Sequence, residues 1–220
     1  MAEHTRRSRK RKRWGNPLWL ALPLAALALV LAVVLLRQEA APGPELKIPV
    51  PEELPEWVID RTIPVNEFSR PGIPMEAMNG IVIHYVGNPG TGAEQNRSFF
   101  AGLAQSGETY ASSNFVIGLE GEVLLCVPIG EVAYCSNNRN SDTLSIEVCH
   151  PDDTGEFTAA SYDALVKLVN WLRDFYGLDT DAVIRHYDVT SKECPRYFVE
   201  HPDAWERFKL DLSAAEQDNG

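Results

Sequence analysis

Short apolar runs bounded by turn residues recur along residues 60–212. The run GIVIHYVG at residues 80–87 lies between glycines, which indicates a buried strand. Residues 113–128 predict two strands around a Leu-Glu-Gly-Glu turn, and residues 143–150 predict another strand. The run AVIRH at residues 182–186 predicts a further short strand.

Apolar residues also recur at helical spacing, which predicts three helices. The clearest pattern lies between Thr158, a suitable N-cap, and Gly177, a suitable stop, and its members are Leu165, Leu168, Val169, Leu172 and Phe175. Residues 94–103 and 203–210 predict two shorter helices. Strands mixed with helices predict an α/β domain around one sheet.

A different pattern precedes this domain. Residues 18–36 form an apolar run of nineteen residues without a charge, and about 20 residues are needed to cross the hydrocarbon core of a bilayer. We therefore predict a transmembrane signal-anchor helix at residues 18–36. The alternative is a cleaved signal peptide and a secreted protein. The run is longer than the usual ~7–15 residues of such a signal, and no clear small-x-small cleavage site ends it.

The charges are distributed unevenly on the two sides of this run. Residues 1–16 carry seven Lys or Arg and one acid, whereas residues 38–220 carry twelve Lys or Arg and thirty acids. Basic residues beside a membrane span stay in the cytoplasm, so we predict a basic cytoplasmic tail at residues 1–17 and an extracytoplasmic domain. The acidic surface of that domain argues against binding to nucleic acid.

Composition then divides the extracytoplasmic part. Prolines and glutamates dominate residues 37–59, which predicts a semi-extended linker between the membrane and the domain. The folded domain is expected at residues 60–212, as a monomer, and a flexible tail at residues 213–220.

Two histidines and a cysteine are candidate metal ligands. His84 and His186 each lie near the end of a predicted strand, and Cys194 follows after a loop long enough to turn back. Two imidazoles and one thiolate can hold zinc and leave a fourth position open for water. Each histidine could instead be an ordinary core residue, and Cys194 a buried thiol or half of a disulfide. The sequence does not decide whether Cys126, Cys135 and Cys149 form disulfides.

Two charged residues accompany these candidates. Glu147 lies inside the apolar strand LSIEVC, where an unpaired carboxylate is costly to bury, and it could exchange protons with a water and a leaving amine. Lys192 lies two residues before Cys194, so it could reach the same cleft and stabilise an oxyanion. The alternatives are an outward-facing strand residue and a solvated loop lysine.

Five ordered segments carry a resemblance to a known family. They are SRPG, GIVIHYVGNPGT, TYASSNFVIGLEGEVLLCVP, NRNSDTLSIEVCHPDDTGEF and VIRHYDVTSKECPRYFV. Together they resemble the zinc-dependent type 2 N-acetylmuramoyl-L-alanine amidases, which include endolysins and autolysins and are related to peptidoglycan-recognition proteins. The resemblance implies a single mixed central β-sheet flanked by helices, here preceded by the transmembrane helix.

The resemblance also implies a role for each candidate residue. His84, His186 and Cys194 would bind one Zn²⁺, Glu147 would act as general base and acid, and Lys192 would stabilise the tetrahedral intermediate. The substrate would be peptidoglycan, cut between N-acetylmuramic acid and L-alanine. The rival hypotheses are a peptidoglycan-recognition domain that binds the polymer without cutting it and a membrane protein whose outer domain only holds partners.

Overall fold

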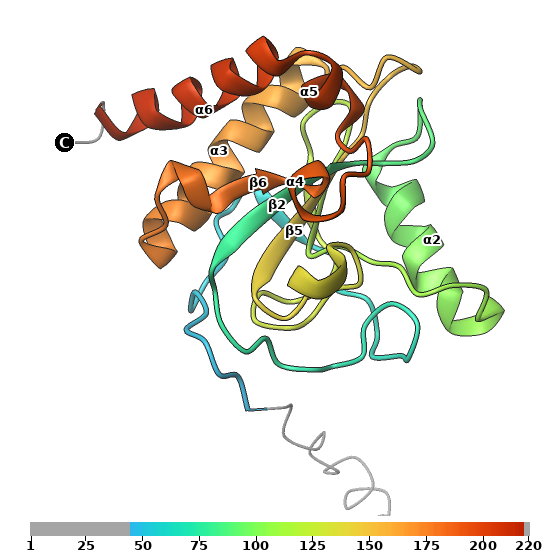
Figure 1. The fold of residues 1–220 in the computed structure, drawn as a ribbon. Coiled ribbons are helices and arrows are strands. Elements are labelled where there is room, and N and C mark those ends of the chain that lie inside the picture. The colour runs from blue at the N-terminus through green and yellow to red at the C-terminus, as the bar shows by residue number, and fades with distance from the viewer. Residues whose placement is uncertain (1–44, 218–220) are drawn as a thin grey trace, which may run out of the picture. The chain divides into compact units, whose positions relative to one another are not determined.

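The computed structural model describes residues 45–217, which form a six-stranded sheet with helices on both faces (Figure 1). The strands lie in the spatial order β1-β4-β3-β5-β2-β6. Only the β3–β4 pair is antiparallel, so the sheet is mixed. The bounds of the strands are β1 Val58–Asp60, β2 Gly80–Tyr85, β3 Phe115–Ile117, β4 Val123–Leu125, β5 Thr143–Val148 and β6 Val183–Arg185. The predicted α/β fold with a mixed central sheet is confirmed.

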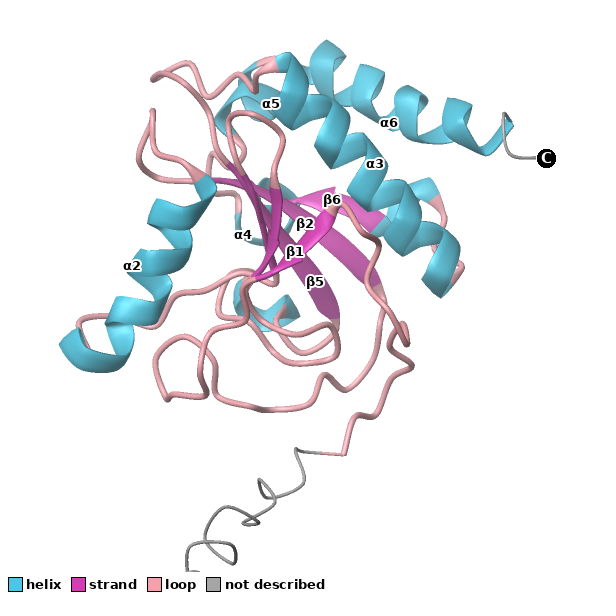
Figure 2. Cartoon of the chain, turned by 180° about the vertical axis from the view of Figure 1, so that it is seen from behind, coloured by secondary structure: helices cyan, strands magenta, loops and turns pink. Residues whose placement is uncertain are grey.

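The helices divide between the two faces of the sheet (Figure 2). Helices α3 (Ala159–Tyr176) and α6 (Pro202–Gln217), with the short α5 (Arg196–Glu200), cover one face and bury the larger core with it. Helix α2 (Ala93–Ser106) covers the other face, where Phe100 packs with Val116 and Leu124. The remaining short elements are η1 (Asn137–Arg139), η2 (Thr180–Ala182) and α4 (His186–Thr190).

The alternation of side chains along β2 decides which face receives the candidate histidine. Ile81 and Ile83 pack into the larger core beneath α3. Because successive side chains of a strand point to opposite faces, His84 lies on the side of the sheet that α2 covers. In the parallel pairing of β2 with β5, His84 lies directly beside Glu147. The sheet register therefore places these two polar side chains next to each other.

The predicted helices exist, and two of them extend beyond the predicted bounds. Helix α3 begins after Thr158, whose hydroxyl accepts a hydrogen bond from Ser161 N, and it ends at Gly177 in the left-handed conformation with φ +66°. Helix α2 runs to Ser106, three residues past the prediction. Helix α6 runs to Gln217, seven residues past the prediction and into residues 213–220, which the sequence assigned to a flexible tail.

The folded domain begins earlier than the sequence predicted. Val58–Asp60 form strand β1, which pairs in parallel with β4, and Ile48 is buried in the larger core. Trp57 packs against the same core and meets Trp171 edge-on, with ring centroids 6.0 Å apart. The predicted linker at residues 37–59 is therefore wrong over residues 48–59, where a few apolar side chains among the prolines and glutamates bury themselves against the domain.

The predicted membrane segment precedes the part of the chain that the structure describes. Residues 1–17, 18–36 and 218–220 lie outside the described part of the chain. Within residues 45–217, no helix has both the length and the apolar character that crossing a bilayer requires.

Candidate active site

The candidate ligands meet where three neighbouring parallel strands end. Strand β2 lies between β5 and β6 in the sheet, and His84 is its penultimate residue. His186 is the first residue of α4, which follows β6 directly. In open α/β sheets, ligands bind at the carboxyl ends of the strands, and this is the edge at which both histidines lie.

A tight turn returns Cys194 to the histidines. Helix α4 ends at Thr190, and the next residue, Ser191, takes the left-handed conformation with φ +65° and reverses the chain. The amide of Tyr187 then donates to the carbonyl oxygen of Cys194 over 2.9 Å, which ties the end of the loop to the start of α4. The eight residues that separate Cys194 from His186 therefore comprise the short helix α4 and the turn that brings the chain back.

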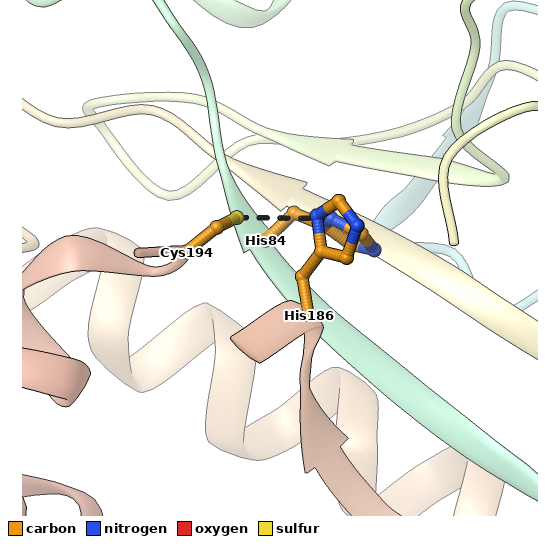
Figure 3. A group of neighbouring side chains, drawn as sticks. All are labelled: His84, His186 and Cys194. Atoms are coloured by element: carbon orange, nitrogen blue, oxygen red, sulfur yellow. Dashed lines mark hydrogen bonds between the residues drawn. The ribbon is translucent and has the colours of Figure 1, made fainter. Parts of the chain in front are cut away.

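The donor atoms of the three residues converge (Figure 3). One ring nitrogen from each histidine and the Cys194 sulfur all lie within 4.8 Å of one another. The sulfur is 3.8 Å from Nδ1 of His84, and the two imidazole centroids are 4.6 Å apart. Nδ1 of His186 is buried and has no hydrogen-bond partner among the described residues. A soft thiolate with two imidazoles is the donor set that zinc prefers, so the residues fit this metal.

The remaining nitrogen of each imidazole contacts a loop residue. Nε2 of His84 lies 3.0 Å from Oγ of Ser136, and Nε2 of His186 lies 2.9 Å from Oδ1 of Asn137. Both histidines are more than nine-tenths buried. Each imidazole is thus held through Nε2, and its opposite edge faces the other candidate ligands.

Glu147 is the buried carboxyl beside these ligands. Burial raises its pKa to about 7, although the Cys135 hydrogen bond and the charge of Lys192 act in the opposite direction. Oε1 accepts a hydrogen bond from the Cys135 thiol over 3.5 Å. Oε2 is buried without a partner in the described part of the chain. A carboxyl with a pKa near neutrality and one free oxygen is suited to taking up and returning a proton.

Burial keeps the candidate ligands uncharged when no cation is present. It raises the pKa of Cys194 to about 12, with a further upward contribution from Glu147. Burial also lowers the pKa of both histidines, and Lys192 adds to this effect. A bound cation reverses the balance for the thiol, because metal coordination deprotonates it.

A cavity of about 310 Å³ opens over these groups. His84, Glu147, Lys192, His186 and Cys194 all line it, so the structure brings together every site residue that the sequence predicted. The exposed Lys192 lies at its mouth, and its other walls come from Tyr85, Gly87, Phe100, Ala111, Ser112, Tyr134 and Cys135.

Three site residues were not predicted from the sequence. Cys135, Ser136 and Asn137 contact Glu147, His84 and His186 respectively. These contacts join positions 12 to 52 residues apart, and no local pattern marks them. The one available signal was Cys135 itself, a thiol in a polar loop.

The structure shows Cys126, Cys135, Cys149 and Cys194 all as free cysteines.

Comparison with known proteins identifies the family. The model of the Amidase_2 family, described as N-acetylmuramoyl-L-alanine amidase, matches residues 74–197 and so includes all five predicted site residues. The chain belongs to this family. It is 33% identical over 154 residues to a probable N-acetylmuramoyl-L-alanine amidase of Bacillus licheniformis, an alignment that covers 64% of this chain and 43% of that protein. It is 30% identical over 173 residues to the N-acetylmuramoyl-L-alanine amidase BlyA of Bacillus subtilis (strain 168), covering 69% and 46%. The alignments thus span less than half the length of either relative.

Solved structures support the same fold. The catalytic domain of XlyA superposes with a TM-score of 0.60 at 24% identity, covering 70% of this chain and 98% of that domain. The PlyG catalytic domain gives 0.61 at 18% identity, covering 71% and 93%. At these identities the likeness establishes the fold.

Proposed function

We propose that this protein is a zinc-dependent N-acetylmuramoyl-L-alanine amidase, which hydrolyses the amide between N-acetylmuramic acid and L-alanine in peptidoglycan. The observation that carries the proposal is the convergence of His84, His186 and Cys194 in one cavity with Glu147, whose Oε2 is buried. The matched family and the names of its relatives supply the substrate class.

The zinc ligands in this proposal are the two histidines and Cys194. The convergence of their donor atoms supports the assignment, as does Nδ1 of His186, which has no hydrogen-bond partner among residues 45–217. When bound, zinc would act as a Lewis acid that makes water more acidic and the scissile carbonyl more electrophilic.

Glu147 then carries the proton through the reaction. Its Oε2, which has no partner in the described part of the chain, takes a proton from the attacking water as the water oxygen bonds to the carbonyl carbon. When the carbon–nitrogen bond breaks, Glu147 returns this proton to the nitrogen of L-alanine. The products are the muramyl carboxylic acid and a free amino group on the peptide.

Lys192 supplies positive charge at the mouth of the cavity. Its side chain is exposed and lines the cavity, and its backbone is tied to Cys194, because Cys194 N donates to the carbonyl of Lys192 over 2.7 Å. A cation at this position stabilises the negative charge that develops on the carbonyl oxygen during attack.

A membrane anchor at residues 18–36, with the tail at 1–17 in the cytoplasm, belongs to the same proposal. The uncharged run and the basic residues before it support this topology. Because Ile48 is already part of the core, the connection consists of residues 37–47, which reach at most about 40 Å when extended. The enzyme would therefore act on peptidoglycan close to the membrane.

The test is to incubate the full-length protein, purified with zinc, with intact peptidoglycan and to measure newly exposed L-alanine amino groups. The wild-type protein should release them, while chelation and Glu147→Gln should each reduce the rate at least about 100-fold. Glu147→Gln should retain its zinc. Full turnover by this variant at unchanged zinc content contradicts the role of Glu147. Tight binding of the polymer without new amino groups indicates a recognition protein instead.

A further inference from the structure

Three consecutive residues, at the end of one loop and the start of η1, contact three residues of the site. The Cys135 thiol meets Glu147 at 3.5 Å, the Ser136 hydroxyl meets His84 at 3.0 Å, and the Asn137 amide oxygen meets His186 at 2.9 Å. The histidines lie on different elements, β2 and α4. A single short segment therefore reaches every element that contributes an imidazole to the site.

The contact with Asn137 fixes which nitrogen of His186 carries the proton. The oxygen of an amide only accepts hydrogen bonds, so Nε2 of His186 must be the donor. In the neutral ring, Nδ1 then has the free lone pair. Nδ1 of His186 is also the buried atom that lacks a partner among the described residues. His186 is one of the two histidines that offer a donor atom close to the Cys194 sulfur.

The contact of Ser136 with His84 is compatible with the same position of the proton, because a hydroxyl can accept a hydrogen bond from Nε2 as well as donate one. The hydroxyl lies at Nε2 and is almost completely buried, while Nδ1 is the atom 3.8 Å from the Cys194 sulfur. A proton on Nε2, donated to Ser136, leaves the Nδ1 lone pair facing the sulfur. In this arrangement, Nδ1 is the nitrogen with the free lone pair in both imidazoles.

We infer that Ser136 and Asn137 are the positioning residues of the metal site. They hold His84 and His186 in the Nε2-protonated form before any metal arrives, so that both imidazoles bind through Nδ1. The inference rests on the proposed zinc function and deepens it. Outer hydrogen bonds of this kind fix the tautomer and the orientation of a metal-binding ring, and their loss commonly weakens metal binding about 10- to 100-fold.

The loop is itself held in place, as such a role requires. The side-chain oxygen of Asn140 accepts hydrogen bonds from the amides of Cys135 and Ser136, at 3.1 and 2.6 Å. Asn137 adopts φ +55°, a left-handed conformation that asparagine tolerates better than most residues. Arg139 forms an ion pair with Asp142 at 2.8 Å just after the turn. The backbone of the loop is thus fixed independently of the histidines.

The test uses two pairs of variants in the full-length protein. Asn137→Gly accepts the left-handed backbone but removes the amide, whereas Asn137→Asp keeps an oxygen acceptor. Ser136→Ala removes the buried hydroxyl, whereas Ser136→Thr keeps it. Asn138→Gly makes the same exchange at the next, exposed residue of the turn and is the matched control. Thermal unfolding of each metal-free variant identifies any that fail to fold.

Two readouts are needed, and neither depends on activity. The first is the tautomer of each histidine in the chelated protein, from ¹⁵N chemical shifts of labelled histidine assigned with His84→Gln and His186→Gln. The second is the zinc dissociation constant from competition with a chromophoric chelator. We expect Nε2–H in the wild type, loss of this preference in Asn137→Gly and Ser136→Ala, and zinc binding weakened about tenfold or more. Asn137→Asp, Ser136→Thr and Asn138→Gly should remain close to the wild type.

The inference is overturned if wild-type His84 or His186 carries its proton on Nδ1. It is also overturned if Asn137→Gly and Ser136→Ala keep both the tautomers and the zinc affinity of the wild type. A wild-type protein that has the expected tautomers but binds no zinc would instead overturn the proposed function, because the positioning of the rings would still be present.

Discussion

At the scale of single residues, the site is a small set of polar groups at positions where the surrounding sequence is apolar. His84 and Glu147 each interrupt a buried strand, and this interruption made them visible in the sequence. What the sequence could not provide was the register of β2 against β5, which places them side by side. Register depends on contacts between distant segments, so only the resemblance to a family indicated that these residues act together.

Glu147 should make the stability of the metal-free protein depend on pH. Its pKa is raised to about 7 in the folded state from an ordinary value of 4.5, so burial of the charged carboxylate opposes folding at high pH. The cost is absent below the ordinary pKa, grows between the two values and reaches about 3 kcal/mol above the folded pKa. Glu147→Gln should therefore stabilise the chelated protein at about pH 8 and lose this advantage at about pH 4.

Urea unfolding of both proteins across this pH range measures the difference. Glu120→Gln removes the same charge from an exposed turn and controls for the change in net charge. A stability difference between Glu147→Gln and the wild type that does not vary with pH would show that the carboxyl is not desolvated in the folded protein.

At the scale of elements, the sequence predicted helices and strands best where residues close in sequence determine their bounds. Helix α3 was expected from its apolar spacing together with Thr158 and Gly177, and the structure has both ends there. Strand β1 was missed because it has only three residues, and prolines and glutamates dominate the segment before it. Its place in the sheet comes from pairing with β4, a contact that composition does not report.

The N-cap of α3 should have a measurable effect on stability. The Thr158 hydroxyl accepts a hydrogen bond from Ser161 N at 3.0 Å and donates one to the carbonyl of Leu119 at 2.7 Å. Thr158→Ala loses both and should lower the free energy of unfolding by about 1–2 kcal/mol, with the urea slope unchanged. Thr158→Ser keeps the hydroxyl and should lose much less. Equal losses in the two variants would mean that the methyl group, and not the cap, carries the effect.

At the scale of the whole molecule, the chain combines an acidic folded domain that carries the site with an N-terminal apolar run that the sequence predicts to span a membrane. The sequence predicted the fold, the three candidate ligands and the Glu147–Lys192 pair. It missed the loop at residues 135–137, because contacts across tens of residues depend on how the sheet and its loops assemble. The structure also assigns residues 48–59 of the predicted linker to the folded domain.

The anchor can be tested by fractionating cells that express the full-length protein. We expect the protein in the membrane fraction, released by detergent but not by alkaline carbonate, because an apolar span of nineteen residues is held by the bilayer interior. A variant lacking residues 18–36 should leave this fraction. A shortened, active protein in the medium would instead indicate a cleaved signal peptide.

The central claim is that one zinc ion, held by His84, His186 and Cys194, makes this protein a hydrolase. The most direct measurement adds zinc stepwise to the chelator-treated, full-length protein and records the release of L-alanine amino groups from peptidoglycan. We predict activity that rises linearly to one equivalent of zinc per chain and then stays constant, and no rise in His186→Ala at any equivalence. Full activity before zinc is added, or a His186→Ala protein that follows the wild-type curve, would contradict the account.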